Sequence, residues 1–397
     1  MKGFFKTSSS KAPFPTIPRC GSCGLRRKCK TPKMTVVGRG RKSILVVGTH
    51  PTKEADSRGG PFTGSHGERV RDDFKAAGLD LEKDCWKTYA VNCCVRSGEI
   101  PKQSVASCRP LLLKAIAEYK PKVIVLMGSE AIESVFGYIR SEEKSIQKWA
   151  GWTIPYHDWN AWICPIKDVA HVEEEDSKAI DLEWGRHIRA IAGKVGEALP
   201  PIPKANIEIE FNNDRAVGIL TEFYENPAPI AFDYETNMLK PDSPEAAIVT
   251  CSVCWAGRRT IAFNWTEETK WAMWKLLLSH DHPKIASNMK FEERWTRAIM
   301  DISVQEWQWD TMLAAHVLDN RSGITSVKFQ AFVLLGQESY DDEISSYLKS
   351  DNSNTPNRIY ECDREKLLEY NGLDSFLEYR VSQIQMKAFG YPFVGGK

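Results

Sequence analysis

A proline-rich stretch divides the chain into two long parts. The segment ALPPIPKAN, residues 198–206, holds three prolines. Proline lacks a backbone N–H and fixes φ, so it ends helices and is excluded from central strands. The chain has 397 residues, which is too long for one ordinary hydrophobic core. We therefore expect a linker at 198–206 between two domains, at 19–197 and 207–397, preceded by a basic flexible arm at 1–18.

Strand-like and helix-like patterns alternate before the linker. Short apolar runs are separated by segments with helical periodicity. The runs lie at residues 43–48, 122–128 and 161–166, and the helical segments at 67–77, 110–119, 129–137 and 181–197. This alternation is typical of an α/β domain built on a parallel sheet.

The part after the linker has a different order. Strand-like segments come first, with one helix among them, and several helices finish the chain. The strands are expected at 207–211, 229–236, 246–257 and 258–265, the early helix at 213–224, and the longest helix at 363–388. The last two strands read as antiparallel neighbours. We expect a second α/β domain, with helices flanking a β-sheet.

Composition and charge limit the class of protein. Hydrophobic residues make up 42% of the chain and charged residues 26%, as in soluble globular proteins. No apolar run is long enough to cross a bilayer, and the start has no apolar core of signal-peptide length, so we expect a cytoplasmic protein with no membrane partner. Up to Lys53 there are thirteen basic and no acidic residues, which indicates either a phosphate-backbone contact or a solvated tail.

Two acids directly follow an apolar run in IAFDYETN. Asp233 and Glu235 are two residues apart, a spacing that directs both side chains to one face of a strand. Carboxylates held this close repel each other. The pattern therefore indicates either a cation bound between them or a solvated strand end.

Two later segments carry side chains that could join this pair. SNMKFEERW places Asn288, Phe291 and Glu292 at an expected strand-to-helix junction. EYNGLDSF places Tyr370 and Asp374 four residues apart, on one helix face. The separations allow all three segments to meet at one end of a sheet.

In these ordered motifs the second half resembles the 3′–5′ exonuclease superfamily, most closely the proofreading domain of family A DNA polymerases. The resemblance covers residues 206–390 and includes WDTMLAAHVLD, similar to the helix after the second motif. It implies a ribonuclease H-like fold and two Mg²⁺ or Mn²⁺ ions that activate water and neutralise the phosphate. The implied metal ligands are Asp233, Glu235, Glu292 and Asp374, and Tyr370 would orient the attacking water. Family members usually carry Asp where Glu292 stands.

The same resemblance implies a substrate and partners. Contacts to the terminal nucleotides fall on Thr236, Leu239, Asn288 and Phe291, with Leu239 against the 3′ base. The expected substrate is a single-stranded or frayed 3′ end of DNA, and the expected partner is a separate DNA polymerase chain. An exoribonuclease and a non-catalytic adaptor are the alternatives.

Eleven cysteines in a reducing compartment favour metal binding over disulfides. Cys20 and Cys23 form a C-x-x-C pair, and Cys93 and Cys108 lie far along the chain. Such a set fits either Zn²⁺ or a four-iron cluster. A second pair in CSVC, 251–254, lies on an expected strand, where its members would face opposite sides, so we discount it.

Around these cysteines the first half resembles the iron–sulfur uracil-DNA glycosylases and related phage proteins. The matching pieces cover residues 18–190 in order. They are CGSCGLRRKC, SILVVGTHP, GGPFTGSHG, WKTYAVNC, CRPLL and PKVIVLMGSEA. The resemblance implies a 4Fe–4S cluster on Cys20, Cys23, Cys93 and Cys108, with Cys29 and Cys94 as extra cysteines, and a phage origin for the chain.

The glycosylase pocket itself is altered in this chain. Phe62 matches the aromatic residue that stacks on the base. Thr49 stands in place of an acid, Tyr89 in place of the asparagine that reads uracil, and Asp168 in place of a histidine. We therefore expect a domain that has lost uracil excision and serves DNA binding or polymerase docking.

Overall fold

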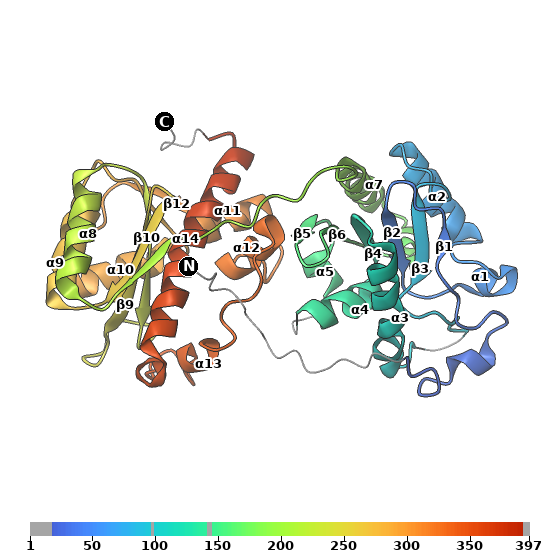
Figure 1. Cartoon of the computed structure of the whole chain (residues 1–397), viewed down its shortest axis with the longest axis horizontal. Coiled ribbons are helices and arrows are strands. Elements are labelled where there is room, and N and C mark those ends of the chain that lie inside the picture. Colours follow the sequence, from blue (N-terminus) through green and yellow to red (C-terminus); the bar gives the residue numbers. More distant parts are fainter. Residues whose placement is uncertain (1–17, 97–98, 141–144, 392–397) are drawn as a thin grey trace. The chain divides into compact units, whose positions relative to one another are not determined.

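The computed structural model describes residues 18–96, 99–140 and 145–391. It divides the chain into two compact units, Met1–Pro201 and Ile202–Lys397 (Figure 1). Each contains one six-stranded sheet, and the expected fold class of two successive α/β domains is confirmed. The basic arm expected at 1–18 lies outside the described residues except for its last position. Among the described helices, none has the length and apolar character that would span a bilayer.

The sheet of the first unit is parallel at its centre. Its strand order is β1-β3-β2-β4-β6-β5. The strands are β1 (Val37–Gly38), β2 (Ile44–Gly48), β3 (Cys85–Tyr89), β4 (Val123–Met127), β5 (Ile154–Tyr156) and β6 (Ala161–Ile166). The four central strands run parallel, as predicted, whereas β1 and β5 pair antiparallel at the two edges. These edge strands of two and three residues are too short to show a period in the sequence.

Helices cover both faces of this sheet. They are α1 (Lys53–Arg58), α2 (Ser65–Ala76), α3 (Gln103–Tyr119), α4 (Ser129–Ile139), α5 (Ile146–Trp149), α6 (Val169–Glu175) and α7 (Lys178–Gly193). Side chains of β2 pack with Phe74 of α2 and Trp184 of α7 in one buried cluster. One helix boundary was wrong: α3 begins seven residues before Pro110, which lies inside it. A proline was expected to start that helix, but the ring is accommodated here within a long helix.

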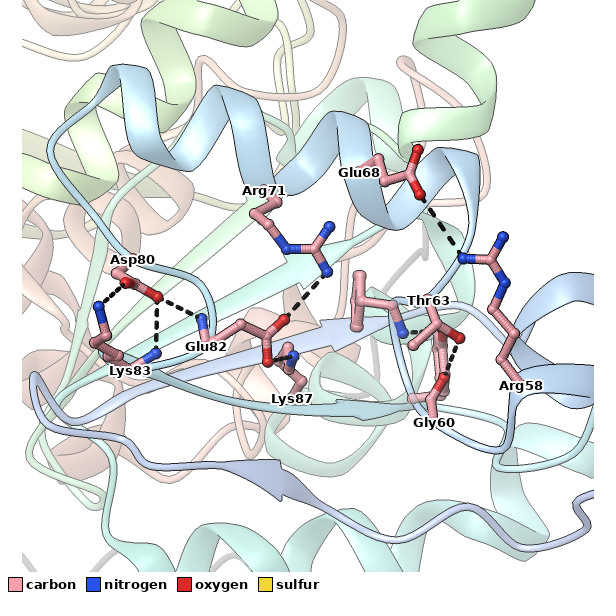
Figure 2. A network of polar contacts seen from close by, with 11 residues as sticks. Arg58, Gly60, Thr63, Glu68, Arg71, Asp80, Glu82, Lys83 and Lys87 are labelled. Carbon is pink, nitrogen blue, oxygen red and sulfur yellow. Dashed lines mark hydrogen bonds and ion pairs between the residues drawn. The ribbon is translucent and has the colours of Figure 1, made fainter.

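The missed central strand β3 carries a buried lysine. Lys87 is almost completely buried, and its Nζ donates to Glu82, which also accepts from Arg71 of α2. Figure 2 shows this network, in which Glu82 connects the start of β3 with α2. A lysine in the sequence CWKTY hides the strand from a hydrophobic pattern, because the charge is compensated only in three dimensions.

The second unit has the strand order β12-β11-β8-β9-β10-β7. The strands are β7 (Ile207–Glu210), β8 (Ile230–Thr236), β9 (Ile248–Trp255), β10 (Arg259–Asn264), β11 (Lys284–Ala286) and β12 (Trp307–Asp310). β9 pairs antiparallel with β8 and β10, whereas β8, β11 and β12 are parallel. This is the ribonuclease H-like sheet that was predicted, extended at one edge by β7.

Helices pack on both faces of the second sheet. They are α8 (Asn213–Glu225), α9 (Glu267–Leu278), α10 (Met289–Met300), α11 (Thr311–Leu318), α12 (Val327–Leu335), α13 (Ser345–Leu348) and α14 (Arg364–Ala388). The long helix α14, red in Figure 1, lies across the sheet. Residues of α12 and α14 pack with Ala231 of β8 on one face, and those of α8 and α9 pack with Phe232 on the other.

Candidate functional site

The end of β8 directs two acids toward α14. Phe232 and Tyr234 belong to the core on the α8 and α9 side. Strand alternation therefore turns Asp233 and Glu235 to the face covered by α12 and α14. Both side chains are partly buried, which favours a bound cation over a solvated strand end.

Three predicted ligands meet at this point. Carboxylate oxygens of Asp233, Glu235 and Asp374 all lie within 4.8 Å of one another. Burial, together with the charge of Asp374, raises the pKa of Asp233 to about 8. Burial and the two neighbouring aspartates likewise raise the pKa of Glu235 well above its usual range. A cation bound between acids crowded in this way stabilises their ionised form.

Tyr370 lies beside this group, with a lysine that the sequence did not suggest. Nζ of Lys328, on α12, donates to the Tyr370 hydroxyl at 2.7 Å and lies 3.4 Å from Oδ2 of Asp374. The Tyr340 hydroxyl donates to the other oxygen of Asp374. Both residues come from segments with no motif of their own, so local spacing could not reveal them.

Asn371 holds Asp233 in position. Its side-chain amide donates to Oδ2 of Asp233 at 2.7 Å. The residue directly follows Tyr370 in EYNGLD and is fully buried. Its place between Tyr370 and Asp374 was a usable signal in the sequence.

Glu292 lies near the group but outside the closest set. It is in the first turn of α10 and is 2% exposed. Its Oε2 has no hydrogen-bond partner among the described residues. Burial and repulsion from Asp233 raise the pKa of Glu292. The start of α10 is fixed by Asp310, which accepts from the amides of Asn288 and Met289.

The predicted nucleotide contacts have different environments. Leu239 is 58% exposed and free to contact a ligand. Thr236 is buried, and its hydroxyl donates to the Met238 carbonyl at 2.8 Å. Phe291 is half-buried against the core near Trp295, and Asn288 takes a left-handed conformation before α10.

The four predicted cluster cysteines lie close together in the first unit. Cys20 and Cys23 precede a short 3₁₀ helix, η1 (Leu25–Lys28), Cys93 follows β3, and Cys108 lies on α3. Burial and the neighbouring thiols raise the pKa of Cys93, and they raise the pKa of Cys108 to about 11.

The two extra cysteines are engaged differently. The Cys29 thiol donates to the carbonyls of Leu25 and Cys94, at 3.2 and 3.4 Å. The loop after Cys29 is held by the buried Asp56, which accepts from the amides of Lys30 and Thr31 and from Arg96. Asp56, on α1, thus holds both the segment that follows Cys29 and the segment that follows Cys94.

The residues at the altered pocket pair with one another. The rings of Phe62 and Tyr89 are stacked with centroids 5.1 Å apart, and the Phe62 amide donates to the Tyr89 hydroxyl at 2.8 Å. The Thr49 hydroxyl donates to Asp168 at 3.1 Å, and Asp168 also caps α6. Of the two histidines nearby, His50 contacts the Pro51 carbonyl and His171 pairs with Glu175.

Comparisons with known proteins agree with this architecture. The sequence model described as "Uracil DNA glycosylase superfamily" matches residues 36–172. The type-4 uracil-DNA glycosylase of Archaeoglobus fulgidus is 28% identical over 144 residues, which cover 36% of this chain and 71% of that protein.

The solved structures that are similar to this chain include two nucleases. The catalytic core of RRP6 from Trypanosoma brucei is 11% identical with a TM-score of 0.38, and the match covers 48% of this chain and 49% of that one. RNase D of Escherichia coli, titled an exoribonuclease involved in structured RNA processing, is 13% identical with a TM-score of 0.36 and covers 47% and 46%. The chain thus spans about half of each.

Different observations characterise the two units. The first rests on the matched sequence, and the second on its sheet order and on the acids that meet beside α14. The first unit thus contains a segment that matches the uracil DNA glycosylase superfamily model, and the second has a ribonuclease H-like sheet at which three acids meet.

Proposed function

We propose that the second unit is a metal-dependent 3′–5′ DNA exonuclease that acts on single-stranded or frayed ends. The observation that carries this is the set of Asp233, Glu235 and Asp374 oxygens, mutually within 4.8 Å and partly buried. Holding like charges together inside a protein is costly unless a counter-charge joins them. A donor set made only of carboxylate oxygens fits Mg²⁺ or Mn²⁺.

The roles of the side chains follow from their contacts. Asp233, Glu235 and Asp374 would hold one cation, and Asp233 with Glu292 a second. When bound, the cations supply a hydroxide at neutral pH and neutralise the phosphate. Tyr370 accepts a hydrogen bond from Lys328, which leaves its own O–H able to donate to the attacking water. Asn371 keeps the Asp233 carboxylate in one orientation.

We assign the first unit a supporting role, as a module for DNA binding or for docking to a polymerase in phage DNA replication. Its superfamily supports DNA rather than RNA as the partner. Cys20, Cys23, Cys93 and Cys108, which lie near one another, would hold the 4Fe–4S cluster that the resemblance to iron–sulfur glycosylases implies. Such a cluster clamps three distant segments and so couples to folding.

Loss of uracil excision is part of the proposal. The Phe62 ring is covered by the stacked ring of Tyr89, and a flipped base would need that space. Thr49 and Asp168 hydrogen-bond to each other. We expect no uracil release from single- or double-stranded DNA, and robust release would refute this part of the proposal.

The decisive experiment for the exonuclease uses matched DNA and RNA strands labelled at the 3′ or the 5′ end. With Mn²⁺ or Mg²⁺, mononucleotides should leave from the 3′ end of DNA, and chelation with EDTA should stop the reaction. Faster digestion of RNA would favour an exoribonuclease. No release from either strand, with metal binding absent as well, would favour a non-catalytic adaptor.

A further inference from the structure

Helix α14 carries an acid that the exonuclease motifs do not include. Tyr370, Asp374 and Glu378 follow one another at intervals of four residues, so they lie on one helix face. They are 7%, 6% and 1% exposed. Glu378 therefore lies one turn beyond Asp374 on the face of α14 that carries Tyr370, and it is more deeply buried than either.

One oxygen of the Glu378 carboxylate lacks a partner among the described residues. Its Oε2 is buried without a hydrogen bond in the described part of the chain, and the same holds for Oε2 of Glu292. The charged groups that act on Glu378 most strongly are Asp233 and Glu292, followed by Asp374 and Asp310. All of them are acids.

The two sides of Asp233 thus differ in charge. On the side of Asp374, Lys328 supplies a fixed positive charge and donates hydrogen bonds. On the side of Glu292 and Glu378, no Lys or Arg is among the main charged neighbours of either glutamate. Two buried carboxylates with unpaired oxygens are expensive in the absence of a cation.

We propose that Glu378 is a fifth carboxylate of the metal centre, and that with Asp233 and Glu292 it binds a second divalent cation before nucleic acid arrives. The proposal rests on the proposed function of this unit. Three carboxylates and water suit the oxygen-rich shell of Mg²⁺ or Mn²⁺. A site of this kind would be loaded in the free protein, without phosphate oxygens from a substrate.

The test counts Mn²⁺ ions bound to the full chain in the absence of nucleic acid, by titration calorimetry and by the electron paramagnetic resonance signal of free Mn²⁺. The parent protein should bind two ions. Glu378→Gln should lose one of them, or bind it on the order of 10- to 100-fold more weakly. Glu365→Gln, the same change at an exposed position of α14, should match the parent.

Each outcome has one meaning. If Glu378→Gln binds two ions as tightly as the parent, Glu378 is not a ligand and this inference is wrong, while the exonuclease proposal stands. If the parent binds no Mn²⁺, the proposed function fails together with it. Should Glu378→Gln not fold, Glu378→Asp keeps the charge on a shorter side chain; it should retain the second ion with weaker affinity, and unchanged affinity would overturn the inference.

Discussion

A single lysine sets the chemistry of the tyrosine at this site. Burial lowers the pKa of Lys328, but the surrounding acids, Asp374 and Glu235 foremost, together raise it above its usual value, so the amine stays protonated. Its Nζ donates to the Tyr370 hydroxyl and also lies over that ring, 4.8 Å from the centroid. Because a protonated amine can only donate, the phenol oxygen must accept. The lysine therefore leaves the hydroxyl hydrogen of Tyr370 free to be donated to the attacking water.

Replacing Lys328 by Met should slow nucleotide release roughly tenfold to a hundredfold, the range expected when a supporting contact is removed. Tyr370→Phe should slow release by a similar factor. The double variant should be little slower, because both changes remove the same hydrogen-bonded pair. Mn²⁺ affinity should not fall. Single-turnover release from 3′-labelled DNA measures the effect. Lys290→Met, an exposed lysine on α10, is the control, and full activity of Lys328→Met would contradict this role.

The paired acids of β8 give a second prediction at this scale. Replacing Asp233 and Glu235 together by Ala should abolish nucleotide release while the fold and DNA affinity remain, because the two raised pKa values mean that these carboxylates repel in the metal-free state. Glu292→Asp should be tolerated, since it keeps the charge. Circular dichroism and DNA binding serve as controls. Release at the parent's rate by the double variant would exclude a metal role for β8.

At the scale of elements, long regular patterns were read correctly and short or compensated ones were not. The strands of 43–48, 122–128 and 161–166 are continuous apolar runs, and the structure contains them as β2, β4 and β6. In β12, the tryptophans of WQWD are only partly buried and show no alternation. The motif residues could be found because each has a local spacing, whereas Lys328 and Tyr340 reach the site through tertiary packing alone.

The cysteine-bearing segments of the first unit pack in a small cluster with Leu25 and Val105. Cys29 donates its S–H to two carbonyls, and burial with the nearby Cys93 raises its pKa to about 11. These backbone acceptors hold the S–H of Cys29 in place. Cys93 lies near Cys20 and Cys23 and packs with Val105 of α3.

We therefore expect Cys93→Ser and Cys29→Ser to differ. Anaerobically prepared parent protein should be brown, with about four irons per chain. Cys93→Ser should lose colour and iron and should lower the unfolding temperature of the first unit, because the clamp between its segments is gone. Cys29→Ser should keep both iron and colour. Equal iron loss in the two variants would show that Cys29 is a ligand, and stoichiometric zinc in the parent would rule out the cluster.

At the scale of the whole molecule, the two units carry buried acids of opposite character. In the first unit, burial opposes ionisation of Asp56, but hydrogen bonds from the amides of Lys30 and Thr31 and from Arg96 lower its pKa below the usual 3.8. In the second unit, burial and mutual repulsion raise the pKa values of Asp233, Glu235 and Glu292. The free energy of unfolding of the two units should therefore depend on pH with opposite sign.

This opposition gives the last prediction. Stability from Asp56 is present above its unfolded pKa and is lost as the pH falls through its lower folded value. The acids of the second unit destabilise it once the pH rises above their unfolded values, and for Asp233 this continues to about 8. In EDTA, thermal unfolding of the second unit should therefore shift to lower temperature between about pH 5 and 8, whereas the first unit should weaken only in acid. Saturating Mn²⁺ should abolish this destabilisation of the second unit with rising pH, because cation binding favours the ionised carboxylates. The Asp233→Ala and Glu235→Ala double variant is the control, with a flatter profile in EDTA. A second unit that becomes more stable with rising pH in EDTA would show that its acids are already balanced by the protein, and the metal site would lose its physical basis.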